Sequence, residues 1–87
     1  MFEINGIVWN IEQVPEYHSR LRKGDNSFAL GSCDSKDRTV YINASTPAYK
    51  LKKVLCHEIT HAAMFSYGIY MSEDQEELIA DLIATYG

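Results

Sequence analysis

The sequence predicts a single α+β domain in which a small sheet packs against two long helices. In the first half of the chain, short runs of β-branched and aromatic residues alternate with turn-forming residues, whereas the second half carries two segments with helical spacing of apolar residues. The length of 87 residues suffices for one domain, 1–87. We therefore expect a sheet of three strands, antiparallel or mixed, that is backed by the two helices.

The strands are expected to precede both long helices. Ile7–Gln13 is predicted as the first strand, and Asn5–Gly6 is a turn signal that favours a short hairpin before it. Pro15–Arg22 fits a short helix, because proline is favoured in a first helical turn. Phe28–Cys33 is predicted as the second strand, and Arg38–Asn43, rich in β-branched and aromatic residues, as the third.

The first long helix is predicted over about Pro47–Tyr67. Thr46 is a suitable N-cap residue, and proline is favoured at the first helical position. Apolar residues then recur with helical spacing, and Gly68 suits the left-handed residue that ends a helix. This helix offers a rigid scaffold for any functional group in its middle.

The second long helix is predicted from Ser72 to about Tyr86. Gln75 lies three residues after Ser72 and completes a capping box. Glu73 and Asp74 fall in the first turn, where acidic side chains favour the positive end of the helix dipole. The short connection before Ser72 predicts that this helix folds back across the first.

The middle of the first helix carries the motif His57-Glu58-Ile59-Thr60-His61, which reads H-E-x-x-H. Residues four apart in an α-helix differ by about 40° around the axis and about 6 Å along it, so both imidazoles reach one point. The intervening glutamate lies beside that point, where it can act on the attacking water. The motif predicts two zinc ligands, His57 and His61, and a catalytic Glu58.

A catalytic zinc site normally has three protein ligands and one open position. A third histidine six residues after the second is excluded, because Met64 and Tyr67 occupy the positions where that pattern requires glycine and histidine. The other option is a glutamate on the following helix. We predict Glu77 as this ligand, with Glu76 and Glu73 as its rivals.

Asp81 lies one helical turn after Glu77 and on the same face. A zinc-bound imidazole favours a carboxylate as the hydrogen-bond acceptor for its other ring nitrogen. Ala80 and Ala84 are small enough to let the two helices approach closely. We therefore predict that Asp81 accepts a hydrogen bond from a ligand histidine.

These residues resemble a known pattern. His57–His61 followed by the motif Glu77-x-x-Ala80-Asp81-x-Ile83-Ala84 resembles the gluzincins and, more closely, the short ImmA/IrrE-type metallopeptidases of phages and mobile elements. Leu30-Gly31, Thr39–Asn43 and the two helical motifs follow in that family's order over residues 28–87, with Asp81 where the family commonly has asparagine. The resemblance implies a minimal zincin fold, one catalytic Zn²⁺ and hydrolysis of peptide bonds in a peptide or protein, for instance a regulator or repressor.

The resemblance also implies where a substrate binds. The strand at about Phe28–Cys33 would form the sheet edge above the cleft, and an extended peptide would add to it as a further strand. Ala29, Leu30 and Gly31 are the implied substrate-binding residues, and Gly31 would allow close approach of the peptide backbone.

Composition excludes several other classes of function. The net charge of −4 and the lack of a continuous basic stripe argue against nucleic acid as the main partner. Cys33 and Cys56 are the only cysteines and are expected to be reduced thiols, as in a cytoplasmic protein. The first residues lack the basic and apolar regions of a signal peptide, and no apolar run reaches membrane-spanning length. We expect a cytoplasmic location without a membrane partner.

Two functions remain after these exclusions. The favoured one is a zinc metallopeptidase. The alternative is a zinc-stabilised binding module that recognises a phage or host regulatory protein without cutting it. The alternative stays open because the sequence selects no donor for the oxyanion, for which Tyr49 and Tyr86 both carry a suitable hydroxyl.

Overall fold

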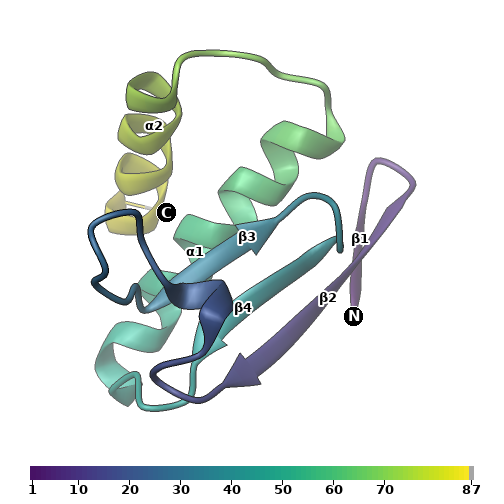
Figure 1. Cartoon of the computed structure of the whole chain (residues 1–87). Helices are drawn as coiled ribbons and strands as arrows, with labels where there is room; N and C mark the ends of the chain where they lie inside the picture. The colour runs from purple at the N-terminus through teal and green to yellow at the C-terminus, as the bar shows by residue number, and fades with distance from the viewer. Residues whose placement is uncertain (87) are drawn as a thin grey trace.

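The computed structural model describes residues 1–86 and has the predicted α+β fold (Figure 1). It contains four strands, not three, in a mixed sheet of order β1-β2-β4-β3. Two long helices follow the sheet in the chain. The elements are β1 Phe2–Ile4, β2 Ile7–Val14, a 3-10 turn η1 Ser19–Leu21, β3 Gly31–Asp34, β4 Thr39–Asn43, α1 Ala48–Ser66 and α2 Glu73–Tyr86.

The additional strand is the first arm of the predicted hairpin. Asn5 and Gly6 both have positive φ, 50° and 80°, as the two central residues of a type I′ turn require. This turn pairs β1 with β2 antiparallel. On its other side, β2 pairs with β4 in parallel, and β3 pairs with β4 antiparallel, so β3 is left at the edge of the sheet.

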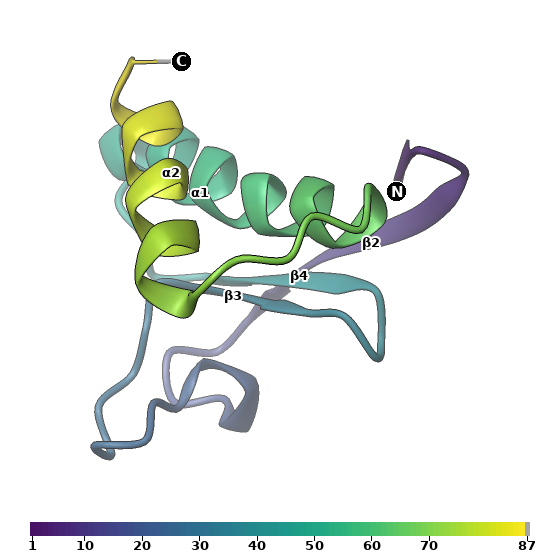
Figure 2. The same cartoon turned by 90° about the horizontal axis from the view of Figure 1, so that it is seen from above.

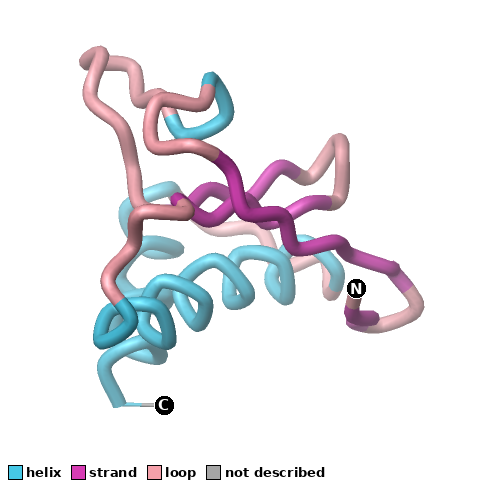
Figure 3. The backbone as a smooth tube through the Cα atoms, turned by 90° about the horizontal axis from the view of Figure 1, so that it is seen from below, coloured by secondary structure: helices cyan, strands magenta, loops and turns pink. Residues whose placement is uncertain are grey.

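The helix α1 covers one face of the sheet and η1 lies on the other (Figures 2 and 3), and each face carries its own core. On the face that α1 covers, Trp9, Val40 and Ile42 pack with Ala62 of the helix. The opposite face holds Tyr41 in a second cluster, completed by Val14 and Leu21 and lying next to η1. The alternation of β4 side chains therefore fixes which face receives the helix.

The helix predicted over Pro15–Arg22 is reduced to the three-residue turn η1. His18 has extended backbone angles, φ −65° and ψ 140°, which interrupt a continuous helix. Its ring stacks on Tyr41 with 6.0 Å between the ring centroids, and its Nδ1 accepts a hydrogen bond from the Arg20 N–H. The tertiary stacking on Tyr41 and this local hydrogen bond override the helical preference that the sequence suggested.

The bounds of both long helices agree with the prediction to within one residue, and Gly68 has the predicted left-handed φ of 67°, but only one of the two predicted N-caps forms. Ser72 Oγ accepts a hydrogen bond from the Gln75 N–H, and the Gln75 side chain accepts one from the Ser72 N–H, as in a capping box. At α1, Pro47 precedes the first helical residue and no side chain caps the helix. Thr46 Oγ1 is instead buried without a hydrogen-bond partner among residues 1–86.

This difference predicts opposite outcomes for two matched substitutions. Ser72→Ala removes a formed cap and should lower the free energy of unfolding by about 1 kcal/mol. Thr46→Val removes an unsatisfied hydroxyl and should leave stability unchanged or raise it by up to about 1 kcal/mol. Urea unfolding of the metal-free protein measures both. If Thr46→Val lowers the free energy of unfolding by about 1 kcal/mol, Thr46 does cap α1.

Within residues 1–86, every helix is too short or too polar to cross a membrane.

Candidate active site

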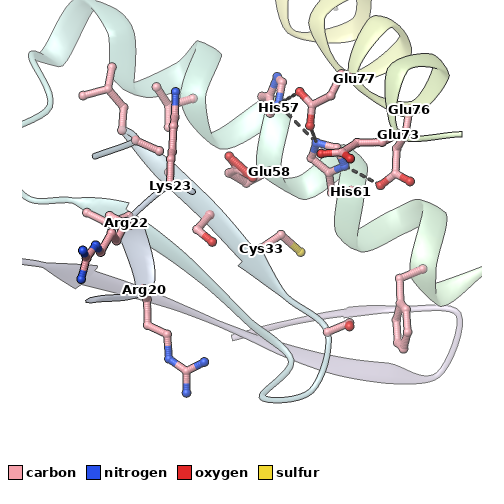
Figure 4. Close-up of a pocket in the computed structure, with 18 of the residues that line it drawn as sticks. Arg20, Arg22, Lys23, Cys33, His57, Glu58, His61, Glu73, Glu76 and Glu77 are labelled. Carbon is pink, nitrogen blue, oxygen red and sulfur yellow. Dashed lines mark hydrogen bonds and ion pairs between the residues drawn. The ribbon is translucent and has the colours of Figure 1, made fainter. Parts of the chain in front are cut away.

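The packing of α2 across α1 brings three predicted ligands together (Figure 4). His57 Nε2 lies 3.1 Å from Glu77 Oε2, and His61 Nε2 lies 3.1 Å from Glu77 Oε1. The two Nε2 atoms are 3.2 Å apart. Ala80 is fully buried, as expected for a small residue that permits close approach of α2 to α1.

The spacing of these donor atoms fits a zinc ion. With ligand bonds of about 2.0–2.1 Å, a four-coordinate zinc keeps neighbouring donor atoms roughly 3.3–3.4 Å apart. The three separations in the structure, 3.1, 3.1 and 3.2 Å, are close to that spacing. Two imidazoles and one carboxylate are also a donor set of catalytic zinc sites, where the fourth position stays open. His57, His61 and Glu77 could therefore hold the metal.

Each histidine has a carboxylate behind it. Asp81 Oδ1 lies 2.9 Å from His57 Nδ1, where the sequence predicted such an acceptor, and Glu76 Oε1 contacts His61 Nδ1. An Nδ1–H that donates to a carboxylate leaves the Nε2 lone pair free for a metal and orients the ring. Both Nε2 atoms thus face the same point. Glu76, predicted only as a rival ligand, is the partner that the sequence reasoning missed.

The sequence offers only a weak indication that Glu76 would contact a ligand histidine. Four acidic residues crowd the start of α2, and neighbours such as Glu76 and Glu77 diverge by about 100° around a helix. Which of them meets the histidines depends on how α2 is rotated against α1. The second rival, Glu73, is exposed and forms no ion pair within the described chain.

Removing either orienting carboxylate should weaken zinc binding. We expect Asp81→Asn and Glu76→Gln each to lower zinc affinity by about 10- to 100-fold, because the matching histidine loses its charged acceptor. Competition with a chromophoric chelator measures the affinity. Asp74→Asn is the matched control, since Asp74 is an exposed acid at the same helix start. Equal effects of all three substitutions would indicate general electrostatics and not ring orientation.

Glu58 lies beside the three donor residues, against the edge of the sheet. Its side chain is buried, and within residues 1–86 its carboxylate makes neither a hydrogen bond nor an ion pair. Burial raises the pKa of Glu58, and the nearby His57 and His61 partly offset this increase. A carboxylate that is kept near the ligands without a structural partner is available for proton transfer.

Gly31 of β3 explains how Glu58 fits there. A Cβ at Gly31 would come within 2.8 Å of Val54 Cγ1 and 2.9 Å of Glu58 Cγ. The glycine therefore lets the strand approach α1 closely, which is a different role from the predicted approach of a substrate backbone. The carboxylate of Glu58 is held between helix and strand as a result.

Cys33 lies on the same strand, and its thiol is expected to be unreactive. Burial raises the pKa of its thiol to about 12, with a further contribution from the charge of Glu58. At neutral pH the thiol is therefore protonated and a poor nucleophile or metal ligand. Both Cys33 and Cys56 are free thiols, as predicted.

The edge of β3 borders an open cleft of about 1320 Å³ that contains His57, Glu58 and His61. The Asn43 N–H donates to the Leu30 carbonyl, so Leu30 faces β4. Antiparallel alternation then turns the main-chain groups of Gly31 and Cys33 outward, away from β4. The edge is open at these two residues.

Two of the predicted substrate-binding residues are already engaged. The Ala29 N–H donates to the Leu21 carbonyl at 2.8 Å, and the Leu30 carbonyl accepts from Asn43. The segment at Leu21 therefore closes the edge immediately before β3. The turn at Lys23–Ser27 follows from its turn-forming residues, but the pairing of residues 21–22 with 28–29 across this turn was not predicted. Gly31 alone of the three predicted residues keeps outward-facing main-chain groups.

The two tyrosines named as oxyanion donors gain no support. Tyr49 is 81% exposed and does not line the cleft. The side chain of Tyr86 lies outside the described part of the structure.

The comparisons with known proteins agree with this geometry. Residues 2–84 match the family described as IrrE N-terminal-like domain (Peptidase_M78). No curated protein matches the chain. The match covers nearly the whole chain. It includes the four-stranded mixed sheet and the two helices that carry the His-His-Glu cluster. The chain belongs to the IrrE N-terminal-like domain family, which groups ImmA/IrrE-type metallopeptidases.

Proposed function

We propose that the protein is a zinc-dependent peptidase that hydrolyses peptide bonds in protein substrates. The observation that carries the proposal is the position of Glu58, a buried carboxylate without a structural partner beside the three donor residues. Burying an unpaired carboxylate lowers stability, so a purely structural site would have no use for it. A catalytic site needs such a group.

Zinc bound by His57, His61 and Glu77 would supply Lewis-acid chemistry, which polarises the scissile carbonyl and lowers the pKa of a water. Glu58 then accepts a proton from the attacking water as its oxygen adds to the carbonyl carbon. When the carbon–nitrogen bond breaks, Glu58 passes that proton to the leaving amine. The raised pKa of Glu58 suits both halves of this transfer, because a base with a pKa closer to neutrality is also a usable acid.

The substrate would bind as an added strand on the open edge of β3. The outward-facing groups of Gly31 and Cys33 offer main-chain hydrogen bonds at the level of Glu58. Main-chain pairing accepts many sequences, so this edge positions a peptide without selecting it. A regulatory protein with a flexible segment is a suitable substrate for such a site.

The test is cleavage of an unfolded protein. Zinc-loaded protein should cleave casein and produce new amino termini that mass spectrometry detects. His61→Ala, purified in the same way, should bind less zinc and leave casein intact. If the zinc-loaded wild type leaves casein and a varied panel of unstructured peptides intact, the peptidase proposal is wrong. A zinc-stabilised binding module would then be the better description.

A further inference from the structure

The cleft has two ends of different chemistry, with Glu58 between them (Figure 4). At the end near the start of α1, the lining includes four cationic side chains, Arg22, Lys23, Lys50 and Lys53. The opposite end is lined by apolar side chains, Phe65, Ile69, Tyr70 and Met71, and by the acidic residues of α2. This segregation is found in a chain whose net charge is −4.

The four cations are exposed, and the contacts that the structure gives them, Arg22 with the Asn26 amide and Lys50 with the Tyr49 ring, are not ion pairs. Within residues 1–86, none of them forms an ion pair, whereas the neighbouring Arg20 is engaged by Asp34 and Asp37 at 2.6 and 2.9 Å. At the other end, Glu76 and Glu77 contact the two histidines. The basic end therefore carries uncompensated charge, while part of the acidic charge is used in the site.

The direction of a bound peptide follows from the strand geometry. β3 and α1 run in the same general direction in Figures 1 and 2, and Gly31 lies against Val54 near the basic end. An antiparallel partner pairs slightly more stably than a parallel one. A peptide that adds antiparallel to β3 would thus place its amino-terminal part at the apolar end and its carboxy-terminal part at the basic end.

Because the edge is closed at Ala29, a bound peptide must turn there toward the cationic side chains. Leu21 occupies the edge at Ala29, so a strand paired with Gly31 must leave the sheet there and meets Arg22 and Lys23 next. Lys53 lies one turn before His57 on α1, about 6 Å along the axis. With about 3.4 Å per extended residue, Lys53 is level with the second residue after the scissile bond.

We infer that the cleft selects protein segments with apolar residues before the scissile bond and acidic residues, from about the second position, after it. A nucleic acid fits less well, because a continuous polyanion would also meet Glu73, Glu76 and Glu77 at the far end. The preference for cleavage rests on the proposed peptidase activity. The preference for binding does not, and it can be measured separately.

The binding experiment uses the zinc-loaded Glu58→Gln variant and three labelled peptides in fluorescence anisotropy. The peptides share an apolar amino-terminal half and carry a neutral, an acidic or a basic carboxy-terminal half. The acidic peptide should bind about 5- to 20-fold more tightly than the basic one, since each exposed ion pair changes an equilibrium by up to about fivefold. The ratio should fall toward one at 1 M salt, where the Debye length is about 3 Å.

A pair of charge-reversal variants with equal net charge locates the effect. In this background, Lys23→Glu with Lys53→Glu should remove or invert the preference. Lys36→Glu with Lys52→Glu should preserve it, because neither of those exposed lysines lines the cleft. If both double variants change the preference equally, net charge and not the cleft explains it, and the inference is wrong.

Two further results would also overturn the inference. One is equal binding of the acidic and basic peptides. The other is tighter binding of a short single-stranded DNA of equal charge, which would make the cleft a nucleic-acid site. If the acidic peptide binds as expected but zinc-loaded wild type does not cut it, the substrate preference stands as a binding property and the peptidase proposal fails.

Discussion

Replacing Glu58 by glutamine is expected to lower kcat/KM for peptide cleavage by about 10²- to 10⁴-fold while zinc remains bound. Glutamine has nearly the same shape as glutamate but cannot accept the proton of the attacking water. The three donor residues are untouched, so zinc stoichiometry should match that of the wild type. Cleavage of a quenched fluorescent peptide measures the rate, and atomic absorption measures the metal. A variant that keeps its activity would remove Glu58 from the proton transfer.

The same substitution has an effect on stability with a defined sign. Burial raises the pKa of Glu58 above its ordinary value of 4.5, so the folded state favours the protonated carboxyl. Its contribution to stability is complete below pH 4.5 and is lost as the pH rises through the folded-state pKa. Glutamine carries no such penalty. Metal-free Glu58→Gln should therefore melt at a higher temperature than metal-free wild type at pH 7, and the gap should close toward pH 4.5.

Removing zinc is expected to have the largest effect on stability. The three donor residues come from two helices, so a zinc ion held by them would join α1 to α2 and would favour the folded chain. At free zinc of one thousand times the dissociation constant, this linkage contributes about 4.1 kcal/mol. For a domain of this size it corresponds to a rise in Tm of about 15–30 °C.

Calorimetry with excess chelator and with excess zinc measures this difference. His61→Ala is the matched control, because it removes one donor and should show little zinc-dependent rise. An unchanged rise in His61→Ala would place the stabilising metal elsewhere in the protein. The Asp81→Asn variant should show an intermediate zinc-dependent rise in Tm, because it weakens the site without removing a donor atom.

The parts of this protein that follow local rules could be predicted from the sequence. The helix bounds depend on apolar spacing, a capping box and Gly68, all of which act within a few residues. His57 and His61 converge because of helix geometry alone, and the chemistry of a three-ligand site narrows the third ligand to the acidic residues at the start of the next helix. These features needed no knowledge of how distant segments pack.

The remaining features depend on contacts between distant segments. The packing of separate elements determines three of them: the parallel pairing of β2 with β4, the closure of the edge by Leu21 and the role of Glu76. Thr46 has the right residue type for an N-cap, yet the chain enters α1 in a conformation that leaves its hydroxyl unpaired. Sequence patterns give the candidates in such cases, and tertiary packing selects among them.

The short open edge of β3 has a consequence for the behaviour of the protein in solution. An unpaired sheet edge is a template for any extended chain, including the edge of another copy, and long apolar edges promote aggregation. Here β3 spans only Gly31–Asp34, and the turn at Leu21 covers the residues before it. Two outward-facing residues are too few to nucleate a stack of strands at this edge. The β3 edge can thus stay open for a peptide while its shortness limits pairing between copies of the chain.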